Sequence, residues 1–335
     1  MTEHDASHDA PVASLRERIA ARRGWVGDRL AGYVVYLGFL AILIFFAIVL
    51  RDQAFLTPAN LLNILRQTAM VSVMAIGMTF ALSAGEIDLS IGSVVALAAL
   101  VTAVLIRDVG LAVAIPCGIG VGVVVGLVNG ILTTKLRIPS FLVTLGMLGI
   151  VSGLARNLTD LQAIPVTDEL FTSVFGGGDL GPVPTLLVWT IAVLGLGHLV
   201  YRKSAFGRQV LATGGNRIAA RYSGINTDRI RIAVLVISAT SAALAGMLFA
   251  GRLHGARYTL GEAELLTVIA AVVIGGTSLF GGRGSVVGAV VGSLIMGILT
   301  NGLILMGLSV NEQMIARGII IILAVALSLR EAREG

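Results

Sequence analysis

The chain has 335 residues, of which 56% are hydrophobic and only 13% carry a charge. Soluble domains average about 25% charged residues, so the composition excludes an ordinary soluble domain and indicates an integral membrane protein. Segments of about ten residues with alternating polarity, which mark membrane β-barrels, are absent from the sequence. The net charge of +5 fits basic residues that flank membrane spans and does not require a nucleic-acid partner.

The first apolar run, 33–50, follows a polar tail that contains five arginines. The run has 18 residues and no small-residue cleavage site after it, so we expect a retained membrane helix and not a cleaved signal peptide. This run and the segments 111–133, 231–251 and 286–306 are long enough, at about 1.5 Å per residue, to cross a hydrocarbon core of roughly 30 Å.

Taken in chain order, the sequence predicts an all-α, polytopic transmembrane helical bundle of about ten spans. The expected spans are 33–50, 68–83, 91–106, 111–133, 138–154, 184–200, 231–251, 265–276, 286–306 and 315–329. An even number of spans places both termini on one face of the membrane. These spans divide the chain into an N-terminal tail over 1–31, a membrane domain over 32–330 and a C-terminal tail over 331–335.

The distribution of lysine and arginine predicts the orientation. With the N-terminus inside, seventeen of these residues fall on the cytoplasmic side and six fall outside. Positive residues favour the cytoplasmic side, so we expect both termini to be cytoplasmic. The longest external loop, 155–183, agrees with this orientation, because it has four acidic residues and one arginine.

Two polar, Gly-rich inserts interrupt the apolar segments, GEIDLSIGS at 85–93 and GGTSLFGGRGS at 275–285. Irregular backbone at membrane depth survives only where protein or a water-filled cavity covers it, and a charged side chain there costs roughly 2.5–3.5 kcal/mol. The inserts therefore predict a transport path. Its candidate residues are Glu86, Asp88, Ser90, Ser93, Thr277, Ser278 and Arg283. The structural alternative is that Asp88 and Ser90 cap the helix that begins at residue 91.

Three of the expected spans, 68–83, 91–106 and 265–276, are short for a single crossing. Short, Gly-interrupted segments in corresponding positions of two halves point to the binding region of a transporter. GSVVAL at 92–97 and GSVVGA at 284–289 each follow an insert, which indicates an internal repeat. Glycines also recur every four residues on two spans, a period that predicts close helix packing. They are Gly118, Gly122, Gly126 and Gly130 on one span and Gly288 with Gly292 on another.

The one substantial cytoplasmic loop is 202–231. Asn216 predicts the N-cap of a short helix from residue 217 to about 223, which Gly224 ends in a left-handed conformation. The loop helix is either a capped, solvated segment or a docking helix for a cytoplasmic partner. Its apolar surface favours docking. The residues of that surface are Ile218, Ala219, Tyr222 and Ile225.

No set of residues in the sequence points to catalysis or to a metal site. The four histidines are scattered, the single cysteine lies in an apolar span, and the carboxylates at membrane depth form one close pair. The segment GHLVYRKS at 197–204 has Arg202 where a phosphate-binding loop needs its second glycine. The glycines at 176, 178 and 181 lie in an external loop with no preceding strand. We therefore expect neither an enzymatic activity nor a bound cofactor in this chain.

Three segments together resemble, in order and spacing, the membrane permease subunits of bacterial ABC importers for ribose, xylose and related sugars. They are GEIDLSIGS, TGGNRIAARYSGI and GGTSLFGGRGSVVGAVVGSLIMGILTNGLILMG, and the similarity runs from about residue 55 to 329. The resemblance implies a multi-pass protein of the bacterial inner membrane. It also implies three partners: a cytoplasmic ATP-binding-cassette ATPase, which uses the ATP, a periplasmic sugar-binding protein, and a second permease copy, identical or paralogous.

The segment TGGNRIAARYSGI also resembles the ATPase-coupling motif of ABC importers. The residues to which the resemblance assigns coupling are Gly215, Asn216, Ala219, Ala220 and Gly224. In that motif a glutamate usually precedes the two alanines, whereas this chain has Ile218. The departure removes a charge contact at that position and leaves the helix and its glycine turn intact.

The resemblance implies import of a monosaccharide, a pentose or a hexose, by alternating access without covalent chemistry. Related permeases carry branched-chain amino acids or autoinducer-2, so these solutes are alternatives. One rival function is a secondary transporter driven by a proton or sodium gradient, with Glu86 and Asp88 as coupling groups. A second rival is a membrane enzyme that acts on lipid-linked substrates, for which the sequence has no catalytic residue set.

Overall fold

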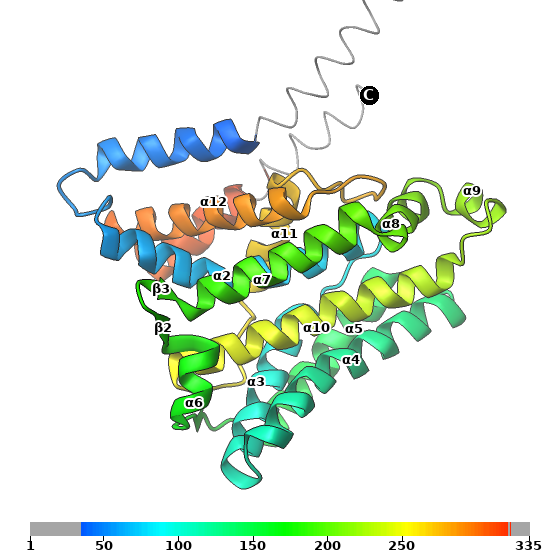
Figure 1. The fold of residues 1–335 in the computed structure, drawn as a ribbon, viewed down its shortest axis with the longest axis horizontal. Coiled ribbons are helices and arrows are strands. Elements are labelled where there is room, and N and C mark those ends of the chain that lie inside the picture. The colour runs from blue at the N-terminus through cyan, green and yellow to red at the C-terminus, as the bar shows by residue number, and fades with distance from the viewer. Residues whose placement is uncertain (1–34, 321, 323–335) are drawn as a thin grey trace, which may run out of the picture.

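The computed structural model describes residues 35–320 and residue 322. Within this part of the chain, seven helices are long and apolar enough to cross a membrane. They are α2 (Pro58–Ser83), α3 (Ile91–Asp108), α4 (Leu111–Lys135), α5 (Ser140–Leu158), α7 (Thr185–His198) with its continuation η2 (Leu199–Lys203), α10 (Thr227–Leu253) and α12 (Val286–Leu305). The helix Val35–Val49, α11 (Glu264–Ile274) and a helical stretch over 310–320 complete the bundle (Figure 1). The prediction of a helical membrane bundle is confirmed.

The two ends of the bundle hold different short elements (Figure 1). At one end, α8 (Ala205–Gly215) and α9 (Arg217–Tyr222) connect η2 to α10. The opposite end holds α6 (Glu169–Thr172), η1 (Ser173–Gly177) and two small antiparallel sheets, β1 (Ile164–Pro165) with β4 (Gly255–Ala256) and β2 (Asp179–Leu180) with β3 (Val183–Pro184). We refer to them as the α8–α9 end and the β2–β3 end. The β1–β4 pair joins the segment after α5 to the segment after α10.

One predicted helix starts earlier than the sequence analysis places it. The expected span 68–83 is part of α2, which begins at Pro58 and has 26 residues. The Thr57 hydroxyl accepts the Asn60 N–H at 3.4 Å, and Pro58 occupies the first turn, where a missing N–H removes no helical hydrogen bond. α2 can therefore cross a membrane, and so can the 18-residue α3, which contains the expected span 91–106. The prediction that these two spans are short is wrong.

Parts of the predicted topology lie outside the described residues. These parts are the tails 1–31 and 331–335 and most of the expected last span, 315–329. The expected spans 33–50 and 265–276 correspond to the two shorter apolar helices, Val35–Val49 and α11. The number of ten spans and the position of the termini therefore stay predictions.

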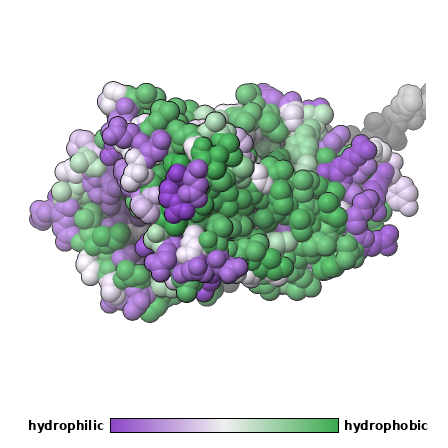
Figure 2. All heavy atoms as spheres, turned by 90° about the horizontal axis from the view of Figure 1, so that it is seen from below, coloured by the Kyte–Doolittle hydropathy of each residue, from purple (hydrophilic) through white to green (hydrophobic). Residues whose placement is uncertain are grey.

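The protein core lies between α2, α3, α10 and α12, which are mostly buried, whereas α4, α5 and α7 are mostly exposed. The exposed side chains of these outer helices include apolar residues such as Val124, Leu145 and Leu196. Apolar side chains cover much of the middle of the molecule, and polar side chains gather toward its two ends (Figure 2). Large exposed apolar surfaces of this kind mark contact with a membrane or with another protein.

Glycines of α4 bring this helix into backbone contact with α10. A Cβ atom on Gly122 or Gly126 would lie 2.5 Å from the nearest α10 atom, and on Gly130 the distance would be 2.8 Å. The atoms met are the Ala239 carbonyl oxygen and the Cα atoms of Val236 and Ile232. Small residues at this period allow helix backbones to approach closely. The prediction that these glycines serve packing is confirmed.

Substitution of Gly126 by leucine should lower the free energy of unfolding by about 1–3 kcal/mol, because the added side chain forces α4 and α10 apart. Gly120→Leu is a matched control on the same helix, since a Cβ at Gly120 meets nothing within 4 Å. Thermal unfolding of the purified protein in detergent measures both variants. Equal melting temperatures for the two variants would contradict the packing role of Gly126.

Candidate functional site

The two polar inserts begin with the same backbone turn. After α2, the Glu86 N–H donates to the Ala81 carbonyl at 2.9 Å, and after α11 the Thr277 N–H donates to the Val272 carbonyl at 3.1 Å. In each turn the preceding residue is a glycine with positive φ, Gly85 at 78° and Gly276 at 87°. Helices commonly end in this way, with glycine in the left-handed conformation. The shared turn supports the correspondence of the two inserts that the sequence indicates.

Both inserts reach the α8–α9 end, where they contact α8. The Gly282 N–H of the second insert donates to the Ser83 carbonyl, the last residue of α2, at 3.0 Å. Gly214 of α8 lies between the two, since a Cβ on it would lie 1.9 Å from the Ser83 oxygen and 2.7 Å from the Gly282 nitrogen. Only glycine fits there. The Ser83 and Tyr201 hydroxyls also share a hydrogen bond of 2.7 Å.

Glu86 is a buried carboxylate between two arginines. Its side chain is 1% exposed and accepts hydrogen bonds from Arg217 of α9, at 3.0 Å, and from Arg231 of α10. A buried charge without partners is strongly unfavourable, so the two guanidinium groups allow the carboxylate to remain there. Through them the first insert is joined to α9 and to α10.

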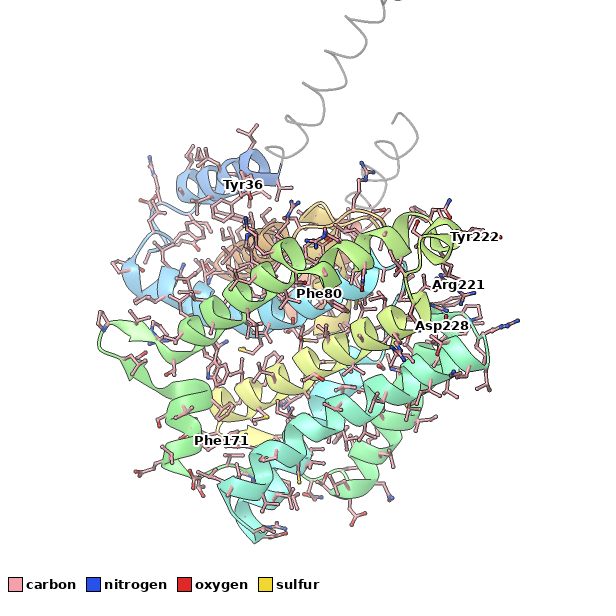
Figure 3. The ribbon with its side chains drawn as sticks, turned by 45° about the vertical axis from the view of Figure 1, so that its right-hand side comes forward. Tyr36, Phe80, Phe171, Arg221, Tyr222 and Asp228 are labelled. Atoms are coloured by element: carbon pink, nitrogen blue, oxygen red, sulfur yellow. The ribbon has the colours of Figure 1, made fainter. Side chains whose placement is uncertain are left out.

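A second ion pair, on the same face of α9, holds the end of this helix. Arg221 donates to the Asp228 carboxylate at 2.7 Å and to the Thr227 hydroxyl at 3.0 Å. Figure 3 shows Arg221, Tyr222 and Asp228 together at the α8–α9 end. Partial burial and the positive charge of Arg231 lower the pKa of Arg217. Arginine is not deprotonated in proteins, so this side chain stays charged at neutral pH despite its lowered pKa.

Asp88 and Ser90 form a buried polar cluster with Asn129 of α4. Asp88 Oδ1 accepts the Ser90 N–H at 3.0 Å and the Ser90 hydroxyl at 2.6 Å, and the Asn129 amide donates to Ser90 Oγ at 3.0 Å. Ser90 is the N-cap residue of α3, but its side chain accepts no N–H of this helix, and Asp88 accepts a backbone N–H only from Ser90 itself. The alternative in which the Asp88 and Ser90 side chains cap the helix is therefore wrong. The Ser93 hydroxyl donates to the Ser90 carbonyl at 2.9 Å.

Two acceptor atoms of this cluster have no hydrogen-bond partner within the described part of the chain. They are Asp88 Oδ2 and Asn129 Oδ1. Buried polar atoms in proteins are almost always hydrogen-bonded. The buried Ser238 hydroxyl of α10 lies beside the Asp88 carboxylate, so the capacity to accept a hydrogen bond from water or from a solute hydroxyl is clearest at Asn129 Oδ1.

Two residues of α5 hold the backbone of the first insert. Ser140 Oγ accepts the Ile87 N–H at 3.1 Å, and Thr144 Oγ1 accepts the Leu89 N–H at 3.0 Å while donating to the Ile87 carbonyl at 3.0 Å. Sequence reasoning missed both residues. Their spacing of four, which places both hydroxyls on one helix face, is the signal that could have pointed to them.

In the second insert, the candidate residues close the turn. Thr277 Oγ1 accepts the Ser285 N–H at 3.3 Å, and Ser278 Oγ accepts the Phe280 N–H at 3.2 Å. The Arg283 side chain is exposed, and its carbonyl accepts the Ser278 N–H at 3.1 Å. These contacts give Thr277 and Ser278 a structural role. Their role in a transport path stays a prediction.

α9 has the caps that the sequence predicts. The Asn216 side chain accepts the Ala219 N–H at 3.0 Å, and Gly224 ends the helix with a φ of 83°. Ala220 is buried, whereas Ile218 is 70% exposed and Tyr222 is 90% exposed. Spaced four apart, these two apolar side chains lie on one face of α9. Gly215, the last residue of α8, contacts Gly282 of the second insert.

Residues 60–325 match the family model described as "Branched-chain amino acid transport system / permease component". The match covers most of the chain. The chain belongs to this permease family. With the seven apolar helices, membership confirms a multi-pass transport subunit of the bacterial inner membrane.

Individual relatives in this family are named for sugar import. The chain is 39% identical to the ribose import permease protein of Bacillus subtilis (strain 168), over 89% of this chain and 92% of the relative. It is also 39% identical to the ribose import permease protein of Escherichia coli (strain K12), over 85% of this chain and 91% of the relative. The identity to the xylose transport system permease protein of E. coli (strain K12) is 35%, over 88% of this chain and 90% of the relative. No solved structure matches the chain.

Substitution of Glu86 by glutamine should destabilise the permease by about 3–5 kcal/mol, because it leaves Arg231 buried without its counter-charge. Glu262→Gln is the matched control, since Glu262 forms an exposed ion pair with Arg156, and exposed pairs contribute only about 0–1 kcal/mol. Thermal unfolding in detergent compares the two. A Glu86→Gln variant as stable as Glu262→Gln would show that the buried ion pairs do not stabilise this end of the bundle.

Proposed function

We propose that this permease forms half of the membrane channel of an ABC importer for a monosaccharide, a pentose or a hexose. The observation that carries the proposal is the connection of α9 to the first insert through Arg217 and Glu86. The exposed apolar side chains of α9 suit docking of a partner protein. The ion pair between Arg217 and Glu86 connects this helix to the first insert inside the bundle. The similarity to permeases named for ribose and xylose supports the substrate class.

The proposal includes ten membrane spans, with both termini and the α8–α9 end in the cytoplasm. A separate ATP-binding-cassette ATPase docks on α9 and hydrolyses the ATP, so this chain binds no cofactor of its own. A periplasmic binding protein delivers the sugar to the β2–β3 end, and a second permease, identical or paralogous, completes the channel. The coupling residues are Gly215, Asn216, Ala219, Ala220 and Gly224.

Movement of α9 would act on the transport path in three steps. The ATPase displaces α9, Arg217 transmits the displacement to Glu86, and the first insert then shifts against Ser140 and Thr144. The Asp88 and Ser90 cluster lies on the same insert, two to four residues further along the chain. Transport in this proposal alternates between two states of the permease, which differ in the position of α9. A partner can shift the equilibrium between these states only by binding them with different affinity.

In this proposal Asp88, Ser90 and Asn129 contact the passing sugar. Sugar hydroxyls are hydrogen-bond donors as well as acceptors, and Asn129 Oδ1 has no donor within the described residues, while Asp88 has only the neighbouring Ser90 and Ser238 hydroxyls and the Ser90 N–H. The polar groups are few and the sugar must leave again, so the contact is weak and transient. The tight, specific binding step belongs to the separate binding protein.

Gly224→Leu should uncouple uptake from ATP hydrolysis while leaving membrane insertion intact. A left-handed conformation costs a residue with a Cβ about 1–2 kcal/mol, an amount that changes an equilibrium by about tenfold, so the end of α9 should rearrange. Gly307→Leu is the matched control, because Gly307 has a φ of 81° and, like Gly224, open space around it. Uptake and ATPase rates in proteoliposomes measure coupling. Normal uptake by Gly224→Leu would contradict the docking role of α9.

Cells or vesicles that contain this permease, its ATPase and its binding protein should accumulate one pentose or hexose, and only with an active ATPase. Uptake is measured for a panel of solutes that contains pentoses, hexoses, branched-chain amino acids and autoinducer-2. A variant of the partner ATPase that cannot hydrolyse ATP is the control. Uptake that persists with the inactive ATPase would favour a gradient-driven transporter. ATPase-dependent uptake of a non-sugar solute would overturn the proposed substrate class.

A further inference from the structure

A cavity of ≈ 680 Å³ opens at the α8–α9 end, within the range of about 300–1,000 Å³ that is typical of ligand sites. Its walls come from four parts of the chain: the start of the first insert, the end of α4 with the turn into α5, α9, and the first turns of α10. The transport mechanism proposed above uses the ion pairs beside this cavity and leaves the cavity itself without a role.

Cationic side chains dominate the lining of the cavity. Five cations face two carboxylates, Glu86 and Asp228. The cations are Lys135, Arg137, Arg217, Arg221 and Arg231. Both carboxylates are already paired, Glu86 with Arg217 and Arg231, and Asp228 with Arg221. Across residues 35–320, no carboxylate oxygen lies within 4.0 Å of Lys135 or Arg137. The cavity therefore has an excess positive charge that suits an anion.

A neutral donor also lines the cavity. Thr133 is buried, and its hydroxyl has no hydrogen-bond partner in the described portion of the chain. Lys135 and Arg137 lie two and four residues after Thr133, and Arg137 has a positive φ of 58° in the turn between α4 and α5. A guanidinium fork, an ammonium group and a hydroxyl are donors that recognise phosphate oxygens.

The cavity also adjoins the apolar outer surface of the bundle. Phe141 lines the cavity and is itself 45% exposed, and Leu136, Leu142 and Leu145 beside it are exposed. They belong to the end of α4 and to α5, two of the helices with the least buried surface. Figure 2 shows that the apolar surface of the bundle extends to the polar groups at its ends. A ligand in the cavity can thus have a phosphate among the cations and hydrocarbon along α5.

We propose that this cavity binds the phosphate group of an anionic phospholipid, with the acyl chains lying on the exposed faces of α4 and α5. Basic pockets between membrane helices bind anionic lipid headgroups in this way. A free phosphate anion has the same headgroup chemistry but makes no use of Phe141 and the leucines. The proposal does not depend on which solute the permease carries.

The lipid site and the docking face use different sides of α9. Arg217 and Arg221 line the cavity, whereas Ile218 and Tyr222 are exposed. A bound headgroup would join the α4–α5 turn to Arg217, the residue that connects α9 to Glu86. Lipid occupancy would therefore restrain the same helix that the ATPase displaces.

The test uses the full-length permease, purified, delipidated and titrated with phosphatidylglycerol or phosphatidylcholine, with bound lipid counted by native mass spectrometry. Phosphatidylglycerol should bind the wild type more tightly than phosphatidylcholine. The double variant Lys135→Gln, Arg137→Gln should bind phosphatidylglycerol about 25-fold more weakly, because each cation near an anionic lipid contributes about fivefold to the affinity. Both residues are exposed, so the fold should tolerate the change, which an unchanged melting temperature verifies.

The matched control is the double variant Arg107→Gln, Arg156→Gln. It removes two exposed arginines from the opposite end of the bundle, where they pair with Asp108 and Glu262, and it should retain the wild-type affinity for phosphatidylglycerol. Equal affinity of the wild type and the Lys135, Arg137 variant would overturn the proposal, as would a wild type without preference for phosphatidylglycerol.

Two further arms separate the lipid from other anions. Inorganic phosphate that binds the wild type when phosphatidylglycerol does not would assign the cavity to a soluble anion and overturn the lipid proposal. Loss of phosphatidylglycerol when the ATPase subunit binds would show that protein fills the cavity in the assembled transporter, which also overturns it. Retention of the lipid by the assembled transporter supports the proposal.

Discussion

The arrangement of the α8–α9 end depends on one buried carboxylate. Glu86 is enclosed by protein, and in such surroundings an anion is stable only while its counter-charges stay beside it. Arg217 and Arg231 supply those charges from two different helices. The first insert, α9 and the start of α10 must therefore keep their relative positions or move together. A partner that displaces α9 alone would strand a buried charge, so the electrostatics favour a concerted movement.

Glycines serve two separate purposes in this bundle. One is the packing of two long helices, and the other is a local contact between backbone segments. On α4, glycines remove side chains so that two long helices touch along their length. At the α8–α9 end, Gly214, Gly281 and Gly282 allow three backbone segments from distant parts of the chain to meet. The α4 glycines pack this outer helix against the core helix α10, and the glycines at the α8–α9 end bring both inserts against α8. The α8–α9 end is thus held by backbone contacts as well as by ion pairs.

Features that depend on neighbouring residues could be predicted from the sequence. Asn216 and Gly224 bound α9 because a cap and a left-handed glycine act within one helical turn, and the glycine period on α4 follows from helix geometry. The partners of Glu86 could not be predicted, because Arg217 and Arg231 are 131 and 145 residues away along the chain. The start of α2 was missed because its first turns contain Asn60 and Asn63, which lower the apolar signal. Asn60 exchanges hydrogen bonds with Asn301 of α12, another pairing that no local pattern reveals.

α10 also connects the two faces of the protein. Its 27 residues span about 40 Å as one continuous helix. Arg231 lies near its start, and the strand that follows it, β4, pairs with β1 at the β2–β3 end. This single helix is thus anchored to the first insert at the α8–α9 end and, through β4, to β1 at the β2–β3 end. In the orientation proposed above, binding of the delivery protein at the β2–β3 end would be transmitted through this one helix to the end on which the ATPase docks, which would make ATP hydrolysis conditional on delivery.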